Sequence, residues 1–158
     1  MEKNPPAFKI TYPKNKKVGI LLSIPHCGVC FPNEIKKDYK TEMVSFPDDT
    51  DWDLNKLYDF ASEMGITTIE AVYSRWVIDL NRTPQNKSLY SDGRIITSLC
   101  PSTDFFGKPI YVSSEKEPSE TEIQRRLKNY FNPYHEKVDS LLSELKKEFD
   151  AVIFWDAH

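Results

Sequence analysis

Two short, nearly continuous apolar runs constrain the fold of this chain more than any other feature. Residues 18–24 read Val-Gly-Ile-Leu-Leu-Ser-Ile and end at Pro25, and residues 151–155 read Ala-Val-Ile-Phe-Trp. Short runs without an alternating polar face are typical of strands buried on both sides, as in parallel sheets. The β-branched segment 66–73 predicts a further strand.

A long segment with helical spacing lies before the last of these runs. Residues 121–149 carry an apolar stripe near a 3.6-residue period, and Ser119 or Thr121 can cap its start. Pro133 removes a backbone donor, so it is expected to kink or split this helix near residues 131–132.

A second, shorter helix is predicted from residues 51–64, which show helical spacing of apolar residues before a stop at Gly65. The acidic segment 48–51 supplies its candidate N-caps. The rest of the chain is expected to be irregular: a lead-in over 1–16, a loop with one short helical turn over 31–51, and a long excursion over 83–118.

Strands that alternate with helices predict an α/β fold, a three-layer sandwich with a mostly parallel or mixed sheet. The length of 158 residues suits a single domain spanning 1–158. With 21 basic and 24 acidic residues, the net charge of −3 argues against a nucleic-acid partner. The absence of a membrane-length apolar run, of a secretory signal and of an even cysteine count predicts a cytoplasmic protein with no membrane partner and reduced thiols.

Two of the three histidines follow predicted strands at their carboxyl ends. His26 comes one proline after the first run, and His158 follows the last run after two further residues. If these strands are parallel, both imidazoles lie at one sheet edge, where α/β folds bind ligands. With one acid from the cluster 48–53 they would form a catalytic zinc set with an open position for water. The alternatives are hydrogen-bonded or surface histidines and a helix-capping acid cluster.

The segment 74–82 reads Ser-Arg-Trp-Val-Ile-Asp-Leu-Asn-Arg and places two arginines around an apolar stretch. Arginine near apolar surface is costly unless it is paired or binds an anion. Asp79 pairs with Arg75 or Arg82 in the structural interpretation. In the functional interpretation, one guanidinium binds a substrate carboxylate and the other faces a polarised carbonyl.

Cys27 and Cys30 form a C-x-x-C spacing, which is compatible with a redox dithiol or half of a structural zinc site. A second C-x-x-C is missing, and Cys100 stands alone. His135 lies at the predicted helix kink, where a histidine either caps or hydrogen-bonds inside the protein, or points into a cleft.

Five stretches, taken together and in order, resemble the N-formylglutamate amidohydrolase (N-formylglutamate deformylase) family. The stretch Ser-Arg-x-x-x-Asp-x-Asn-Arg is the most telling of them, and together they extend over nearly the whole chain. The matching pieces are residues 23–28, 49–53 with 57–61, 74–82, 132–135 and 156–158.

The resemblance implies a fold similar to the zinc carboxypeptidases, of the phosphorylase/hydrolase-like class. It also implies a metal-dependent hydrolase, with zinc as the cofactor, whose partner is a small molecule. Such an enzyme cleaves the amide of an N-acyl amino acid and releases formate and glutamate in the named activity.

The resemblance assigns roles to individual residues as well. Arg75 would polarise the scissile carbonyl, and His135 would contact the substrate. Asn81 and Arg82 would hold the substrate α-carboxylate. The implied metal ligands are His26, Asp51 and His158, with Asp49 as the rival to Asp51.

The chain also departs from the family pattern. Members are longer and continue with a serine after Asp-x-His, so this chain is expected to be incomplete at its C-terminus, with the general base beyond residue 158. Cys27 replaces a small polar residue, and Asp53 replaces a common histidine. Two alternative functions follow: a metal- or carboxylate-binding domain without turnover, and a thiol redox protein that uses the C-x-x-C pair.

Overall fold

A mixed β-sheet forms the centre of the fold. The computed structural model describes residues 4–84 and 98–158. In this part of the chain the strand order is β1-β3-β2-β4, with β2 parallel to both neighbours and β1 antiparallel to β3. The predicted α/β fold with a mostly parallel or mixed sheet is therefore confirmed. The strands are β1 (Phe8–Thr11), β2 (Ile20–Ile24), β3 (Thr67–Ala71) and β4 (Ile153–Asp156).

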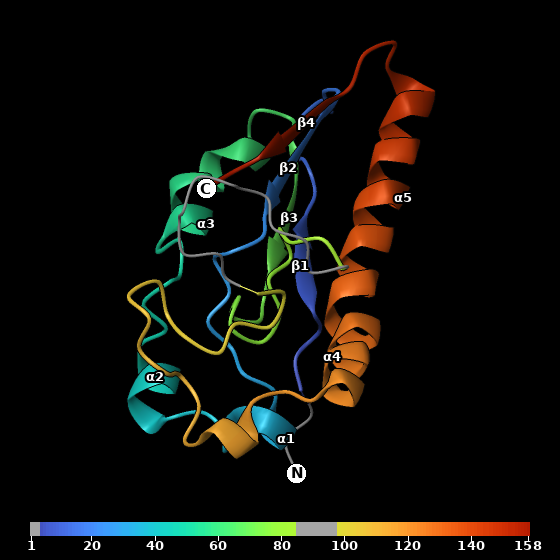
Figure 1. Cartoon of the computed structure of the whole chain (residues 1–158). Coiled ribbons are helices and arrows are strands. Elements are labelled where there is room, and N and C mark those ends of the chain that lie inside the picture. Colours follow the sequence, from blue (N-terminus) through green and yellow to red (C-terminus); the bar gives the residue numbers. More distant parts are fainter. Residues whose placement is uncertain (1–3, 85–97) are drawn as a thin grey trace, which may run out of the picture.

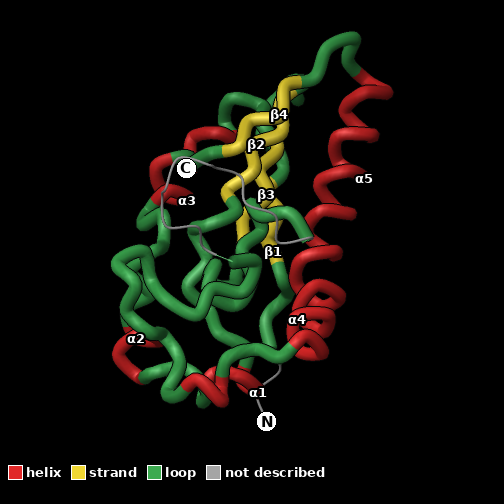
Figure 2. The backbone as a smooth tube through the Cα atoms, viewed as in Figure 1, coloured by secondary structure: helices red, strands yellow, loops and turns green. Residues whose placement is uncertain are grey.

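Helical segments cover both faces of the sheet (Figures 1 and 2). The helix α5 (Asn132–Glu148) runs along one face, and α3 (Leu54–Leu57) with the 3₁₀ turn η1 (Asp59–Ser62) lies on the other. Side chains alternate along β2, so Leu21 joins the larger core cluster with α5, and Leu22 joins the smaller cluster on the η1 side. Both faces of β2 are thus buried, as its apolar run predicts.

The long helical stretch before β4 has three parts. In α4 (Glu120–Arg126), the Oγ of Ser119 accepts a hydrogen bond from the backbone N of Glu122 at 3.4 Å, which confirms Ser119 as the cap. A π-helical turn, η3 (Leu127–Phe131), follows, and α5 begins directly after it. Because Pro133 has no backbone N–H, regular helix cannot run unbroken through it. The predicted division of the helix before Pro133 is confirmed.

The prediction of one regular helix over residues 51–64 is wrong. This segment is split between α3 and η1, with Asp53 at a φ of 58° and no described side chain capping α3, so the acids 48–51 are not its caps. The backbone N of Asp51 instead donates to the carbonyl O of His26 at 3.0 Å, which ties the start of the segment to the end of β2. Gly65, with a φ of 84°, ends the segment as predicted.

The strand β1 corrects the prediction that residues 1–16 are irregular. Phe8 and Ile10 pack against the larger core, while Lys9 pairs across to Glu70 of β3 at 3.0 Å. Phe8 and Ile10 alternate with Lys9 and Thr11, a period of two that is typical of a half-buried strand, so this short segment carried a signal that the prediction overlooked. Pairing with β3 supplies the hydrogen bonds that stabilise β1.

The loop regions contain three further short elements, so the loop predicted over 31–51 holds two helices rather than one turn. Part of the excursion predicted over 83–118, residues 85–97, lies outside the described residues. Within the described residues, no helix has the length and apolar character needed to cross a membrane. The short elements are α1 (Asn33–Lys36), α2 (Thr41–Ser45) and the 3₁₀ turn η2 (Ser114–Lys116).

The strand β4 differs from its prediction, because its side chains are exposed. It lies at the edge of the sheet, and the exposed fractions of Ile153, Phe154 and Trp155 are 59%, 47% and 43%. The run 151–155 predicts a strand correctly, but its apolar content does not distinguish a central strand from an edge strand. Position in the sheet, set by pairing with β2 alone among the described strands, decides the burial.

Candidate active site

His26 and His158 meet at the carboxyl ends of β2 and β4. Parallel pairing sets Ser23 opposite Asp156, so both segments leave the sheet at the same edge. The two imidazole centroids are 4.9 Å apart. His26 is buried and His158 is exposed. The predicted meeting of both imidazoles at one edge is confirmed.

Asp51 brings a carboxylate to the two imidazoles. Its Oδ2 lies 3.7 Å from His26 Nδ1 and 3.3 Å from His158 Nδ1. The backbone hydrogen bond from Asp51 to His26 holds the acidic loop against this edge. One ligand atom from each of the three residues lies within 4.8 Å of the others, and the described residues contain no second group of this kind.

The environment of His26 fits a bound cation. Its Nε2 is 2.7 Å from Asp79, while its buried Nδ1 lacks a hydrogen-bond partner among the described residues. Buried ring nitrogens are normally paired, so a partner is expected at Nδ1. Two imidazole nitrogens and one carboxylate are a donor set typical of zinc. His26, Asp51 and His158 therefore fit a divalent metal ion.

Asp49, the rival ligand, is engaged elsewhere. Its Oδ2 accepts a hydrogen bond from Trp76 Nε1 at 2.7 Å, and its Oδ1 accepts one from the backbone N of Phe105 at 3.1 Å. Burial raises the pKa of Asp49, although both hydrogen bonds oppose this rise. With both oxygens used to join three chain segments, Asp49 lies outside the cluster that Asp51 joins.

Asp79 contacts His26 as well as an arginine, and the sequence predicted only the pairing with an arginine. It is 0% exposed and accepts hydrogen bonds from His26 Nε2 at 2.7 Å, Arg75 Nη2 at 2.6 Å and the backbone N of Asn81 at 2.9 Å. Burial alone would raise its pKa, but the hydrogen bonds and charges of His26 and Arg75 outweigh burial and hold the pKa well below its usual range. Asp79 therefore stays ionised and fixes the orientation of the His26 ring.

The two arginines of this segment both face Asp79. Arg75 is 7% exposed and its guanidinium lies over the ring of Phe105, 4.8 Å from the centroid. Arg82 Nε lies 3.8 Å from Asp79 Oδ2. The structural interpretation, in which Asp79 pairs with an arginine, holds, and Arg75 is the close partner.

Asn81 contacts the cluster of His26, Asp51 and His158 directly, whereas His135 does not. Asn81 Nδ2 lies 3.0 Å from His158 Nε2. His135 Nε2 donates instead to the carbonyl O of Leu80 at 2.9 Å, and its ring packs on Phe131 with centroids 4.2 Å apart. Burial lowers the pKa of His135. The geometry joins Asn81 to the cluster directly and His135 through the backbone beside Asn81.

Comparison with known proteins identifies the family of this chain. The sequence model of the family described as N-formylglutamate amidohydrolase matches residues 18–158, which include all the side chains of the cluster. The chain belongs to the N-formylglutamate amidohydrolase family. The family assignment made from the five sequence stretches is therefore confirmed.

Two curated relatives carry the name N-formylglutamate deformylase. The protein from Pseudomonas aeruginosa is 40% identical over 145 residues, which cover 92% of this chain and 53% of the relative. The protein from Pseudomonas putida is 37% identical over 142 residues, covering 90% and 52%. This family member thus spans about half the length of the curated relatives it matches.

Solved structures support the fold of this family member. The crystal structure of N-formylglutamate amidohydrolase from Ralstonia eutropha superimposes with a TM-score of 0.77 at 23% identity, over 96% of this chain and 57% of that one. A crystal structure of a gene product from Agrobacterium tumefaciens gives a TM-score of 0.76 at 18% identity, over 98% and 56%.

In this N-formylglutamate amidohydrolase family member, two buried polar side chains, Arg126 and Tyr39, hydrogen-bond to the backbone of the segment 74–82. Arg126, 1% exposed, donates from Nη1 to the carbonyl O of Val77 at 3.0 Å and to Tyr39 at 2.9 Å. The Tyr39 hydroxyl donates to the carbonyl O of Trp76 at 3.0 Å. Sequence reasoning missed this pair of side chains, although a charged residue on the apolar stripe of the helix was a usable signal.

Cys27 of this family member lacks the environment of a reactive thiolate. In the described part of the chain all three thiols are free. Cys27 Sγ lies 3.5 Å from the carbonyl O of Ile24 and 3.6 Å from that of Ala71, either of which can accept its single hydrogen. Burial raises the pKa of the Cys27 thiol to about 12. Because the thiolate is the reactive form, a thiol held protonated is unsuited to disulfide exchange.

Proposed function

We propose that this chain carries the metal site and part of the substrate site of a zinc-dependent amidohydrolase acting on N-formylglutamate or a closely related N-acyl amino acid. The observation that carries this proposal is the buried Nδ1 of His26, which has no hydrogen-bond partner among the described residues and lies beside Asp51 and His158. Membership of the family and the names of the two deformylase relatives support the substrate class.

His26, Asp51 and His158 would hold the metal ion. A bound divalent ion would supply a Lewis acid and a water whose pKa is lowered toward neutrality. On the protein side, Asp79 accepts the Nε2 hydrogen of His26, which leaves the Nδ1 lone pair free to bind. The same carboxylate keeps a negative charge next to His26 and so favours a cation at this ring.

The substrate would lie against the residues of the segment 74–82. Asn81 and Arg82 are proposed to hold the α-carboxylate, and Arg75 to stabilise negative charge that develops on the scissile carbonyl oxygen. Arg75 uses Nη2 for Asp79, so its remaining nitrogens are the donors for this role. The contact of His135 with substrate and the location of the general base beyond residue 158 stay predictions.

Zinc binding and turnover test this proposal separately. The purified chain, dialysed with zinc and freed of excess, should retain stoichiometric metal, and chelation should remove it. His26→Ala and His158→Ala should each lose most of the metal, whereas the double variant Cys27→Ser, Cys30→Ser should keep it. Formate release from N-formylglutamate, followed by proton NMR, measures turnover. Equal zinc retention by the wild type and both histidine variants would contradict the proposed site.

A second function, metal or carboxylate binding without turnover, has one observation in its favour. The chain covers only 53% and 52% of the length of its two curated relatives, so about half of each relative is not matched by this chain. Zinc retention with no formate release favours this function. Formate release that stops on chelation favours the amidohydrolase.

A further inference from the structure

A chain of hydrogen bonds connects the hydrophobic core to His158. The hydroxyl of Tyr134, on α5, lies 3.0 Å from Ser23 Oγ on β2. Ser23 Oγ donates to Asp156 Oδ1 at 2.8 Å, and Asp156 Oδ2 lies 3.1 Å from His158 Nε2. Tyr134 and Ser23 are 1% and 2% exposed, so this series of hydrogen bonds runs from the interior of the protein to the edge of the sheet.

The direction of each hydrogen bond follows from its neighbours. Ser23 has one hydroxyl hydrogen and gives it to Asp156, so Tyr134 must donate its own hydrogen to Ser23. Burial raises the pKa of Tyr134, which keeps its hydroxyl protonated as this role requires. The carboxylate of Asp156 is left with Oδ2 to accept a hydrogen from the His158 ring.

The sheet explains why these groups meet. Ser23 and Leu21 point to the same face of β2, the face that α5 covers, because side chains alternate along a strand. The β2–β4 register then sets Asp156 opposite Ser23. Asp156 lies on an edge strand with exposed side chains, and contact with solvent alone would leave its carboxylate free to rotate. The hydrogen bond from Ser23 Oγ fixes the orientation of this carboxylate.

We propose that Tyr134 and Ser23 are positioning residues that act through Asp156 to place the hydrogen of His158 on Nε2 and leave Nδ1 facing Asp51. This inference rests on the proposed function, in which Nδ1 of His158 is a metal ligand. In that tautomer His158 Nε2 donates to Asp156 Oδ2, and the side-chain amide of Asn81, whose Nδ2 lies 3.0 Å from His158 Nε2, would present its oxygen to the ring instead. Neither Tyr134 nor Ser23 touches the metal site itself.

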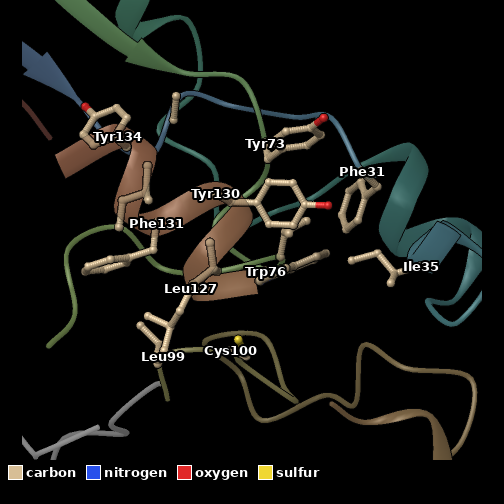
Figure 3. Packing of buried hydrophobic residues seen from close by; sticks show 14 of the residues in the cluster. Phe31, Ile35, Tyr73, Trp76, Leu99, Cys100, Leu127, Tyr130, Phe131 and Tyr134 are labelled. Carbon is tan, nitrogen blue, oxygen red and sulfur yellow. The ribbon is translucent and has the colours of Figure 1, made fainter. Parts of the chain in front are cut away.

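The same helical stretch offers a matched control. The hydroxyl of Tyr130 donates to Glu34 at 2.8 Å, and Tyr130 is also buried, at 7% exposed. Figure 3 shows the Tyr130 and Tyr134 hydroxyls turned in different directions from neighbouring turns of the helix. Tyr130→Phe and Tyr134→Phe therefore remove the same atom from the same core, and only one of them breaks the connection to His158.

The deciding measurement is the tautomer of His158 in the metal-free chain at pH 8, read from its ring nitrogen NMR shifts. Wild type and Tyr130→Phe should hold hydrogen mainly on Nε2, whereas Tyr134→Phe and Ser23→Ala should shift it toward Nδ1. Zinc affinity, measured by competition with a chromophoric chelator, should fall about 3- to 10-fold in Tyr134→Phe. That loss is smaller than the roughly 10- to 100-fold typical of a direct partner of a ligand.

The outcomes separate this inference from the proposed function. An unchanged tautomer balance in both Tyr134→Phe and Ser23→Ala, with far-UV circular dichroism matching wild type, overturns the positioning role whatever the zinc affinity. If wild type binds no zinc, the proposed function fails, but the tautomer measurement still decides whether Tyr134 and Ser23 orient His158.

Discussion

Each of the two histidines at the sheet edge contacts a carboxylate, but one of these pairs is buried and the other is partly exposed to solvent. His26 follows a central strand and contacts Asp79, with side-chain exposures of 4% and 0%. His158 follows an edge strand and contacts Asp156, with side-chain exposures of 39% and 31%. Each ring presents Nε2 to its carboxylate and Nδ1 to Asp51. The chemical arrangement is the same, and only the surroundings differ.

The burial of each carboxylate determines which further group must bind it. A fully buried carboxylate is expensive to desolvate unless a cation pairs with it, and Arg75 fills that position behind Asp79 at 2.6 Å. Asp156 retains contact with solvent, and a neutral hydroxyl, that of Ser23, is sufficient there. We therefore expect changes on the His26 side to lower the stability of the fold most, and changes on the His158 side to act mainly on the proposed metal binding.

The largest expected effect comes from removing the buried carboxylate. Asp79→Ala leaves Arg75 buried without its partner, so the free energy of unfolding should fall by about 3–5 kcal/mol in urea titration. Asp79→Asn, which keeps the shape, should weaken zinc binding about 10- to 100-fold. A loss below about 1 kcal/mol in Asp79→Ala would show that the buried side is not tied to folding.

The second largest effect is expected from Arg126, which hydrogen-bonds to the backbone of the segment 74–82. Arg126→Met removes the donor to the carbonyl of Val77 and to the Tyr111 hydroxyl, so the free energy of unfolding should fall by about 2–3 kcal/mol. The neighbouring Arg125, with a side chain 32% exposed, pairs with Glu122 at the surface. Arg125→Met is the control and should cost about 0–1 kcal/mol. Equal losses in the two variants would contradict this ranking.

The exposed side should respond in ligand binding rather than in stability. Asp156→Asn should weaken zinc binding about 10-fold, because the acceptor that fixes the His158 ring is lost. Its unfolding free energy should change by less than about 1 kcal/mol, since the pair is partly solvated. Isothermal titration with zinc and urea unfolding measure the two quantities. A stability loss as large as that of Asp79→Ala would remove the contrast between the two sides.

The smallest expected effect is a pH dependence at His135, which supports the backbone beside Asn81. Burial lowers its folded pKa, so the unfolded chain binds more protons, and stability falls as pH drops from about 6.5 toward the lowered folded value. This contribution is fully present above about pH 6.5. His135→Gln keeps a donor for the Leu80 carbonyl and should lose that slope. Urea unfolding between pH 8 and 5 measures it, and identical slopes would contradict the assignment.

Part of the candidate site could be predicted from the positions at which the strands end. His26 and His158 could be predicted together because each ends an apolar run, and parallel runs end at one edge. Asp51 and Asp49 could not be separated, since both lie in one acidic segment and only the contacts to Trp76 and Phe105 remove Asp49. Tyr134 and Ser23 lay inside matching stretches, but nothing in their spacing shows that α5 places one against the other.

The sequence by itself determined the strands β2, β3 and β4, the helical stretch with its division before Pro133, and the pair of histidines, because periodicity and strand ends are local properties. Only the tertiary structure decided burial and partnership. It made β4 an exposed edge strand, made Asp79 the partner of His26, and joined Tyr134 to His158 through Ser23 and Asp156. Those outcomes depend on which strand lies beside which and on the register between them, and residues more than 100 positions apart contact one another only once the sheet has formed.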